Sequence, residues 1–184
     1  MSGFNLGAAG AQPLLAGAMQ ATLAYRPCVG IMVLNRAGLI WIGRRFDAPN
    51  EPEGPGSWWQ MPQGGIDANE DPKAAALREL AEETGIRSVS IIAESPTWYS
   101  YDLPEALRPR AWGGRYRGQR QKWFLVRFTG EDSEVDIARP AGQGIEFDAW
   151  RWAEASELVP LIVPFKRAVY EQVLDDFGPA LGPA

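Results

Sequence analysis

The acidic residues between positions 79 and 83 have the types and spacing that could bind a divalent cation. Glu79, Glu82 and Glu83 stand at i, i+3 and i+4, so a helix would place them on one face. Like charges at this spacing repel one another by about 0.2–0.5 kcal/mol per pair. Hard cations such as Mg²⁺ or Mn²⁺ remove that repulsion, and they prefer oxygen ligands that they share with substrate phosphates. The spacing therefore predicts a metal site that acts on a phosphate compound.

The residues around these carboxylates complete a longer pattern. Gly64 is followed after five residues by Glu70, and after seven more by a stretch from Arg78 to Ile86 that reads R-E-U-x-E-E-x-G-U, with U aliphatic. Arg78 is expected to orient a neighbouring carboxylate, Glu70 being the first candidate, rather than to bind metal. Gly64 and Gly65 let the backbone pass close to metal or substrate. A charged helix after a glycine turn is the ordinary alternative, and the completeness of the pattern argues against it.

A helix over residues 72–84 is expected to carry the carboxylates. Asp71 suits the N-cap position and Pro72 the first helical position. Gly85 can take the left-handed conformation that ends a helix, and the residues in between are good helix formers. The side chains expected to face a core are Ala76, Leu77 and Leu80.

Hydrophobic patterns elsewhere predict an α/β protein. The expected strands cover residues 28–34, 39–43, a segment that ends near 58–63, part of 89–101, 122–128 and 147–152. A helix is expected over residues 165–177, and the proline-rich stretch 47–56 is expected to be a loop. Strands mixed with helices in this way fit an α/β sandwich.

The length of 184 residues suits one domain with its own core. Residues 1–25 carry no charged side chain, and they lack both the basic start of a secretory signal and the continuous apolar stretch of a membrane span. We expect a flexible extension over residues 1–24, one domain over 25–178 and a short tail over 179–184.

The composition excludes several kinds of site. The chain has no histidine, which rules out Ser-His and Cys-His nucleophiles and leaves carboxylate, lysine, tyrosine or metal-bound hydroxide as the base. The single cysteine, Cys28, is expected to be buried in a protein of the reducing cytoplasm. A net charge of −5 argues against broad binding to nucleic acid such as a DNA duplex. Metal and local cations would therefore have to hold a polyanionic substrate.

Residues 64–86 resemble the signature segment of the Nudix hydrolases. This family cleaves diphosphate linkages in compounds that join a nucleoside diphosphate to another group. The resemblance implies an α/β/α sandwich with a mixed sheet and a loop-helix-loop metal site. It also implies that Glu79, Glu82 and Glu83 bind the metal, with the backbone carbonyl of Gly64 as a further ligand.

The resemblance extends over most of residues 25–178. The chain resembles two close branches of the family equally well, the bacterial RNA pyrophosphohydrolases and the plant-type diadenosine tetraphosphate hydrolases. The sequence alone does not choose between these two branches. The matching stretches are 25–27, 29–31, 59–66, 118–125, 146–152 and 165–170.

The same resemblance implies roles for residues outside the signature segment. Glu146 would contribute to the metal site or serve as the base, so that the expected catalytic residues are Glu79, Glu82 and Glu146; without the resemblance, Glu146 would be read as a surface carboxylate. Phe165 would stack on a base, a contact worth roughly 1–3 kcal/mol. The residues expected to contact the polyphosphate are Arg26, Arg45, Tyr101 and Lys166.

A basic and aromatic stretch follows Glu105, and no further acidic residue occurs before Glu131. Basic residues mixed with aromatic ones suit a 5′-polyphosphate end followed by bases, and a solvated loop is the alternative. The residues concerned are Arg108, Arg110, Trp112, Arg115, Tyr116, Arg117, Arg120, Lys122 and Trp123.

The expected activity is a metal-dependent RNA 5′-pyrophosphohydrolase, which converts a 5′-triphosphate or diphosphate end to a 5′-monophosphate and so initiates RNA decay. The alternative is hydrolysis of diadenosine polyphosphates by the same site. Mg²⁺ is the expected metal, with Mn²⁺ as the alternative. A non-catalytic binding module would be expected to lose the acidic residues, and isomerase chemistry is disfavoured because histidine and a reactive cysteine are missing.

Overall fold

The computed structural model describes residues 23–46, 58–138 and 144–181. The expected loop 47–56 and nearly all of the expected N-terminal extension lie outside the described residues. The strands are β1 (Tyr25–Leu34), β2 (Ile40–Arg45), β3 (Trp59–Gln60), β4 (Gln63–Gly65), β5 (Val89–Glu94), β6 (Tyr99–Asp102), β7 (Gly118–Phe128) and β8 (Phe147–Ala153). The α-helices are α2 (Pro72–Thr84), α3 (Ala155–Leu161) and α4 (Arg167–Phe177).

The strands form one mixed sheet with β1 and β7 in its middle. These two strands run parallel, in register from Tyr25 opposite Gly118 to Leu34 opposite Arg127. Strands β2 and β4 pair with β1, strands β5 and β6 pair with β7, and strands β3 and β8 pair with β2, all antiparallel. The expected mixed sheet is therefore confirmed.

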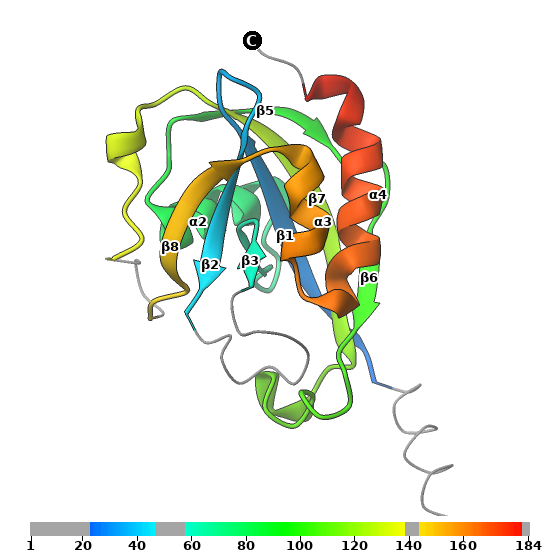
Figure 1. The fold of residues 1–184 in the computed structure, drawn as a ribbon. Helices are drawn as coiled ribbons and strands as arrows, with labels where there is room; N and C mark the ends of the chain where they lie inside the picture. Colours follow the sequence, from blue (N-terminus) through cyan, green and yellow to red (C-terminus); the bar gives the residue numbers. More distant parts are fainter. Residues whose placement is uncertain (1–22, 47–57, 139–143, 182–184) are drawn as a thin grey trace, which may run out of the picture.

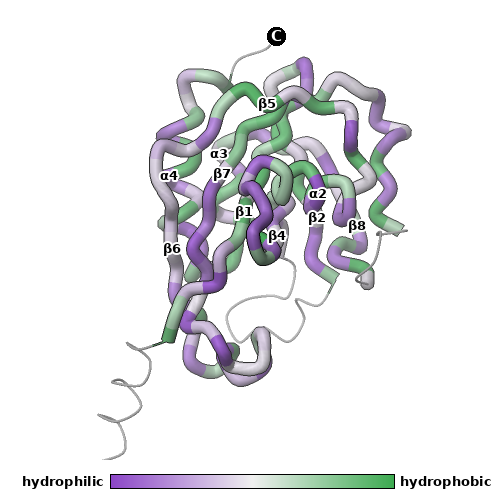
Figure 2. Tube along the Cα trace, turned by 180° about the vertical axis from the view of Figure 1, so that it is seen from behind, coloured by the Kyte–Doolittle hydropathy of each residue, from purple (hydrophilic) through white to green (hydrophobic). Residues whose placement is uncertain are grey.

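Helices cover both faces of this sheet, with α2 behind it and α3 and α4 in front of it (Figure 1). Strand β1 contributes side chains to the core on both faces of the sheet, because successive side chains of a strand point to opposite faces. Its Ile31 and Val33 join the core cluster of α2, which includes Leu80, whereas Met32 and Leu34 join the cluster of α3 and α4. The view from behind shows the hydrophobic course of β1 and the mostly hydrophilic loop between β4 and α2 (Figure 2). The structure is an α/β/α sandwich, as expected.

Helix α2 has the predicted bounds and both predicted caps. The Asp71 side chain accepts hydrogen bonds from the backbone N–H groups of Lys73 (3.0 Å) and Ala74 (3.2 Å). Gly85 has a φ of 77°, in the left-handed region, and its N–H donates to the carbonyl of Ala81 at 3.1 Å. The short polar loop and the helix are thus fixed by local signals that the sequence displays.

One residue of α2 was assigned to the wrong environment. Leu77 does not face the core, because its side chain is 42% exposed while Ala76 and Leu80 are buried. Each residue turns the helix by about 100°, so Leu77 lies well around the axis from Ala76. The buried strip of α2 is narrow and consists largely of alanine, which lets the helix lie close to β1 and β4.

The single strand expected within residues 89–101 is instead two strands, β5 and β6, which both pair with β7. Pro96 lies between them and has no N–H to donate to a ladder. The Ser95 hydroxyl accepts from the N–H of Trp123 (3.1 Å) and donates to the carbonyl of Thr97 (2.8 Å), which holds the break in place.

Two further differences concern the end of the chain. Helix α3 was not expected, and its first turn is fixed by reciprocal hydrogen bonds between Glu154 and Glu157 rather than by a serine or threonine cap. The helix expected over 165–177 begins as a 3₁₀ turn, Pro164–Lys166, before α4 starts at Arg167.

None of the helices within the described ranges is long and apolar enough to cross a membrane.

Candidate active site

Residues from distant parts of the chain line one cavity of about 660 Å³. Its wall draws on β1, β2, β4, α2, β6 and the turn before α4. Glu70 is the one predicted site residue that does not line it. The predicted site residues that do line it are Arg26, Arg45, Gly64, Arg78, Glu79, Glu82, Glu83, Tyr101, Glu146, Phe165 and Lys166.

Gly64 lies directly against the carboxyl group of Glu79. A Cβ atom added to Gly64 would stand 2.0 Å from the Glu79 carboxyl carbon, so even a methyl group would displace that carboxylate. Gly64 is held in place by pairing with Val29 of β1. The predicted approach of the Gly64 backbone to metal or substrate stays a prediction, and in the structure the immediate neighbour of Gly64 is Glu79.

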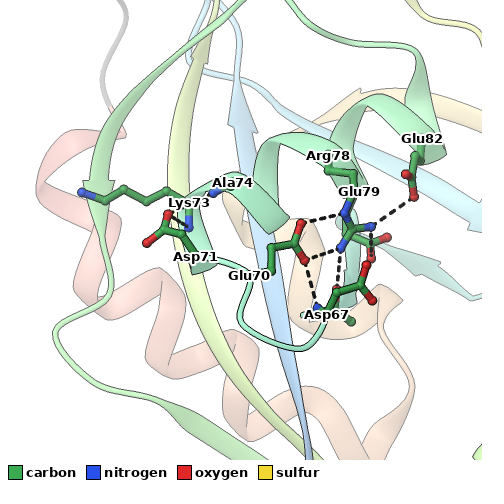
Figure 3. Close-up of polar contacts among 9 residues, drawn as sticks. Asp67, Glu70, Asp71, Lys73, Ala74, Arg78, Glu79 and Glu82 are labelled. Atoms are coloured by element: carbon green, nitrogen blue, oxygen red, sulfur yellow. Dashed lines mark hydrogen bonds and ion pairs between the residues drawn. The ribbon is translucent and has the colours of Figure 1, made fainter.

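The Arg78 guanidinium ties the loop before α2 to the acidic face of the helix (Figure 3). It donates to both Glu70 carboxylate oxygens at 2.8 Å and to the carbonyl of Gly65 at 2.9 Å. It also donates to Glu79 at 2.8 Å and to Glu82 at 3.2 Å. The predicted contact between Arg78 and Glu70 is present, and Arg78 in addition fixes two of the carboxylates that line the cavity.

Glu70 is a strongly stabilised carboxylate. The hydrogen bonds from Arg78, together with one from the backbone N–H of Asp67 at 2.9 Å, lower the pKa of Glu70 to about 2. Glu70 therefore stays ionised throughout the neutral range and keeps its two links to Arg78.

Burial disfavours the ionised form of two other acidic residues of the cavity, Glu79 and Glu83. Burial, and then the nearby Glu146, raise the pKa of Glu83 well above its usual value, although its carboxylate accepts a hydrogen bond from the N–H of Gln63 at 3.2 Å. Burial also raises the pKa of Glu79, against the opposing effect of Arg78. A bound cation would stabilise the ionised form of these groups.

Gln60 connects two predicted site residues and was not identified from the sequence. Its side-chain amide nitrogen donates to Glu146 at 3.4 Å, and its amide oxygen accepts from the Lys166 ammonium at 3.3 Å. Both Gln60 and Lys166 are almost fully buried. The only sequence signal was a glutamine between two bulky residues, Trp59 and Met61, in the strand that leads to the signature segment.

Two aromatic rings lie near the Lys166 ammonium, which donates to the Gln60 amide. The rings of Tyr101 and Phe165 have centroids 5.6 Å apart, and the Lys166 ammonium stands 5.6 Å from the centroid of the Tyr101 ring. Burial raises the pKa of Tyr101 well above its usual value, so its hydroxyl stays protonated. The cavity thus joins an acidic wall to an end that carries rings and positive charge.

Comparison with known proteins identifies the family. The NUDIX domain family matches residues 24–173 of this chain. The RNA pyrophosphohydrolase of Rhodopseudomonas palustris (strain HaA2) is 57% identical over 156 residues, which cover 85% of this chain and 93% of that protein. The chain belongs to the Nudix family. The RNA pyrophosphohydrolase of Brucella abortus (strain 2308) is also 57% identical, over 158 residues that cover 85% of this chain and 89% of the relative.

Solved Nudix structures share the fold at much lower identity. The E. coli dihydroneopterin triphosphate pyrophosphohydrolase superposes with a TM-score of 0.61 at 20% identity, covering 81% of this chain and 96% of that one. The C. elegans Ap4A hydrolase superposes with a TM-score of 0.57 at 17% identity, covering 84% and 98%. These similarities support the architecture, whereas the boundaries of the single domain at residues 25 and 178 stay a prediction.

Nudix hydrolases generally require divalent metal ions, and the donor set of this cavity fits one. Its acidic residues offer only oxygen atoms, which hard cations prefer. Burial is the main cause of the raised pKa values of Glu79 and Glu83, and a bound cation would stabilise their ionised forms. Within the described ranges, no three acidic, histidine or cysteine side chains converge in a ready-made coordination cluster. Arg78 instead draws Glu79 and Glu82 to itself.

The basic and aromatic stretch is largely occupied by structural contacts. Arg117 pairs with Asp102 at 2.7 Å, Lys122 donates to the carbonyl of Ser95, and Trp123 is fully buried. Of the nine basic and aromatic residues named for this stretch, only Arg110 and Trp112 line the cavity. The interpretation that this stretch contacts a 5′-polyphosphate end stays a prediction, with Arg110 and Trp112 as its residues at the cavity.

Proposed function

We propose that this Nudix hydrolase is an RNA 5′-pyrophosphohydrolase of the cytoplasm. It would act on the 5′-triphosphate or diphosphate end of RNA and leave a 5′-monophosphate, the step that initiates decay of the strand. The observation that carries the proposal is that one cavity holds the acidic face of α2 together with buried positive charge and aromatic rings. The 57% identity to proteins named RNA pyrophosphohydrolase, over most of both chains, supports the same substrate.

In this proposal the cationic end of the cavity binds the 5′-phosphates. Arg45 and Lys166 would contact the phosphate oxygens, as would Arg26 from strand β1. Tyr101 would lie beside the phosphate chain. Phe165 would stack on a base, because every base has a face that an aromatic ring can cover. The net charge of −5 makes these local cations necessary for binding RNA.

The acidic wall would hold the divalent ion, which we expect to be Mg²⁺, with Mn²⁺ as the alternative. When bound, the ion neutralises phosphate charge and makes water more acidic. The residues that would hold it are Glu79, Glu82, Glu83 and Glu146, with the carbonyl oxygen of Gly64.

The chain's own groups then act on water and on the leaving phosphates. Glu146 would accept a proton from water at a carboxylate oxygen as the water oxygen bonds to phosphorus and a phosphorus–oxygen bond of the diphosphate breaks. Gln60 would keep the Glu146 carboxylate turned toward the cavity, since its amide is oriented from the other side by Lys166. Arg78 and Glu70 would hold Glu79 in position.

The test is the conversion of RNA ends by the purified chain with Mg²⁺. A triphosphorylated oligonucleotide is incubated with the enzyme, and the products are separated and identified by mass spectrometry. We expect a 5′-monophosphorylated strand, and a Glu82→Gln variant should reduce its formation at least about 100-fold. The matched control is Glu171→Gln, an exposed glutamate on α4 outside the cavity. Unchanged turnover in Glu82→Gln, or an RNA end that stays triphosphorylated with wild-type enzyme, would refute the proposal.

A further inference from the structure

The side chains of two glutamines in the cavity wall have no role in the proposed reaction. Gln63 is the first residue of β4, Gln119 lies on β7, and both line the cavity. A glutamine amide can turn either its carbonyl oxygen or its NH₂ group toward a ligand, and these two groups bind opposite kinds of partner. The orientation of the two amides therefore determines which ligands this part of the wall can accept.

Gln121 fixes the orientation of both amides from inside the protein. Its amide nitrogen donates to the side-chain oxygen of Gln63 at 3.1 Å and to that of Gln119 at 2.8 Å. Both oxygens are thus turned inward, which leaves the amide nitrogens of Gln63 and Gln119 for the cavity. Within the described residues neither nitrogen has a hydrogen-bond acceptor, and neither is closed off from solvent.

The indole of Trp123 in turn fixes the orientation of Gln121. Its N–H donates to the Gln121 side-chain oxygen at 3.1 Å, and both side chains are buried. An indole N–H can donate but cannot accept, so it selects the oxygen end of the Gln121 amide. With Gln121 reversed, the indole N–H would face an NH₂ group, and the other two glutamines would turn their oxygens to the cavity. One donor-only group thus distinguishes two networks of the same shape.

Packing holds the Trp123 ring in the place where its N–H has this effect. Gly30 stands opposite Trp123 in the pairing of β1 with β7, and a Cβ atom added to Gly30 would lie 2.4 Å from the indole ring. The ring of Tyr170 meets the indole edge to face, with centroids 5.6 Å apart. The backbone N–H of Trp123 donates to the Ser95 hydroxyl at 3.1 Å. The direction of the indole N–H is therefore set by the sheet and by α4.

Donors at this wall suit an anionic ligand. Gln119 stands opposite Arg26 in the β1–β7 pairing, and Arg26 lines the same cavity. Amide N–H groups beside a guanidinium add hydrogen bonds to phosphate oxygens, and bonds to a charged acceptor are the stronger ones. Carbonyl oxygens in the same place would repel those phosphate oxygens.

We propose that Trp123 is a positioning residue of the cavity. Its indole N–H, acting through Gln121, makes Gln63 and Gln119 present NH₂ donors rather than oxygen acceptors to the substrate. This inference rests on the proposed function only in taking an anionic polyphosphate as the ligand. Trp123 itself does not line the cavity, so its effect on binding passes through the amides.

The test measures binding of a polyphosphate probe by calorimetry with Mg²⁺. The probe is the bismethylene analogue of inorganic triphosphate, which carries anionic phosphate oxygens but cannot be hydrolysed. In one variant of the full chain, Trp123 alone is replaced by its benzothiophene analogue, in which sulfur stands in place of the N–H group. We expect the Kd to rise about fivefold, because loss of this hydrogen bond makes the donor-facing network a minor fraction of the protein.

Nuclear magnetic resonance separates positioning from a merely structural effect. In wild type, the signal of the Gln119 side-chain NH₂ group should shift when the probe is added. In the benzothiophene variant this shift should be smaller, while thermal unfolding shows that the variant remains folded. A wild-type shift of the Gln119 signal in that variant would contradict the assigned chain of contacts.

The matched control is the same replacement at Trp41. Trp41 is also fully buried, but its indole N–H has no hydrogen-bond partner in the part of the chain that the structure describes, so the Kd should not change. Gln121→Met is a second variant, which removes the amide that connects Trp123 to the cavity. It should also raise the Kd, and in its background the replacement at Trp123 should have no further effect.

An unchanged Kd after the replacement at Trp123 would overturn the inference. An equal rise from the replacement at Trp41, equal losses with and without Gln121, or a wild-type chain that does not bind the probe would overturn it as well. Failure of the wild-type enzyme to convert triphosphorylated RNA is a different result. Together with the expected probe binding, it would refute the proposed function and leave the role of Trp123 in place.

Discussion

At Gly64, a single added methyl group would meet the carboxyl group of a predicted metal ligand. The contact with Glu79 leaves no room for a side chain, while the pairing of β4 with β1 prevents the backbone from moving away. Gly64 is thus required for the approach of two groups rather than for an unusual backbone conformation. The role of Gln60 also follows from its individual contacts. Its amide can accept a hydrogen bond from Lys166 and donate one to Glu146 at the same time only in one orientation.

We predict that Gly64→Ala lowers kcat about 100-fold, because displacement of a catalytic group by roughly 1 Å can have an effect of that size. Steady-state kinetics on triphosphorylated RNA measures the change. Gly178→Ala is the control, since an added Cβ there has no atom within 4 Å. Thermal unfolding of both variants checks that they remain folded at the assay temperature. Wild-type kcat in Gly64→Ala would show that the Glu79 carboxylate need not hold its observed position.

At the scale of elements, the loop and α2 act as one unit because Arg78 connects them. The buried strip of α2 attaches the helix to β1, and the Arg78 contacts attach the loop to the helix. The two attachments can be tested separately. Core substitutions test the packing of α2 on β1, and the pH dependence of stability tests the contact of Arg78 with the loop.

We predict opposite outcomes for two leucines of α2. Leu80→Ala should lower the free energy of unfolding by roughly 2–5 kcal/mol, as expected for a fully buried leucine. Leu77→Ala should change it by no more than about 0.5 kcal/mol, because Leu77 is exposed. Urea unfolding followed by circular dichroism measures both. A large loss in Leu77→Ala would mean that a partner or another segment covers this side of the helix.

The Glu70–Arg78 contact should make stability depend on pH at the acidic end. The pKa of Glu70 is about 2 in the folded protein and 4.5 when unperturbed, so its contribution to stability is complete above 4.5 and is lost as the pH falls toward 2. We expect Glu70→Gln to be less stable than wild type at neutral pH, and the difference to shrink through that acidic window. Thermal unfolding in chelator-containing buffers measures it. A difference that stays constant from neutral to acidic pH would contradict the assigned contact.

At the scale of the whole molecule, two kinds of feature could be predicted from the sequence. Local signals predict the ends of a helix, and the family resemblance predicts which residues form the site. The bounds of α2 follow from Asp71, Pro72 and Gly85, each of which acts on its own neighbours. The resemblance supplied the residues that the fold gathers into one cavity. The break at Pro96 was missed although the proline and its polar neighbours Ser95 and Thr97 stand in the sequence, and α3 was missed because it is short and contains Pro160.

The contacts that sequence reasoning could not supply join residues far apart in the chain. Gln60 meets Glu146 across 86 positions and Lys166 across 106. Arg26 meets Trp112 although neither residue's neighbours indicate the other. The basic residues between Arg108 and Lys122 look alike in sequence, and only tertiary structure separates Arg110 at the cavity from Arg117 paired with Asp102.

The most direct test of the central claim offers both candidate substrates to one enzyme. Triphosphorylated RNA and diadenosine tetraphosphate are mixed with the full chain and Mg²⁺, and the ratio of their kcat/KM values is obtained from the products by chromatography. We predict a ratio of at least about tenfold in favour of RNA, and no cleavage of either substrate when the divalent metal is removed by chelation. A higher kcat/KM on diadenosine tetraphosphate than on triphosphorylated RNA would contradict the assignment of RNA as the substrate.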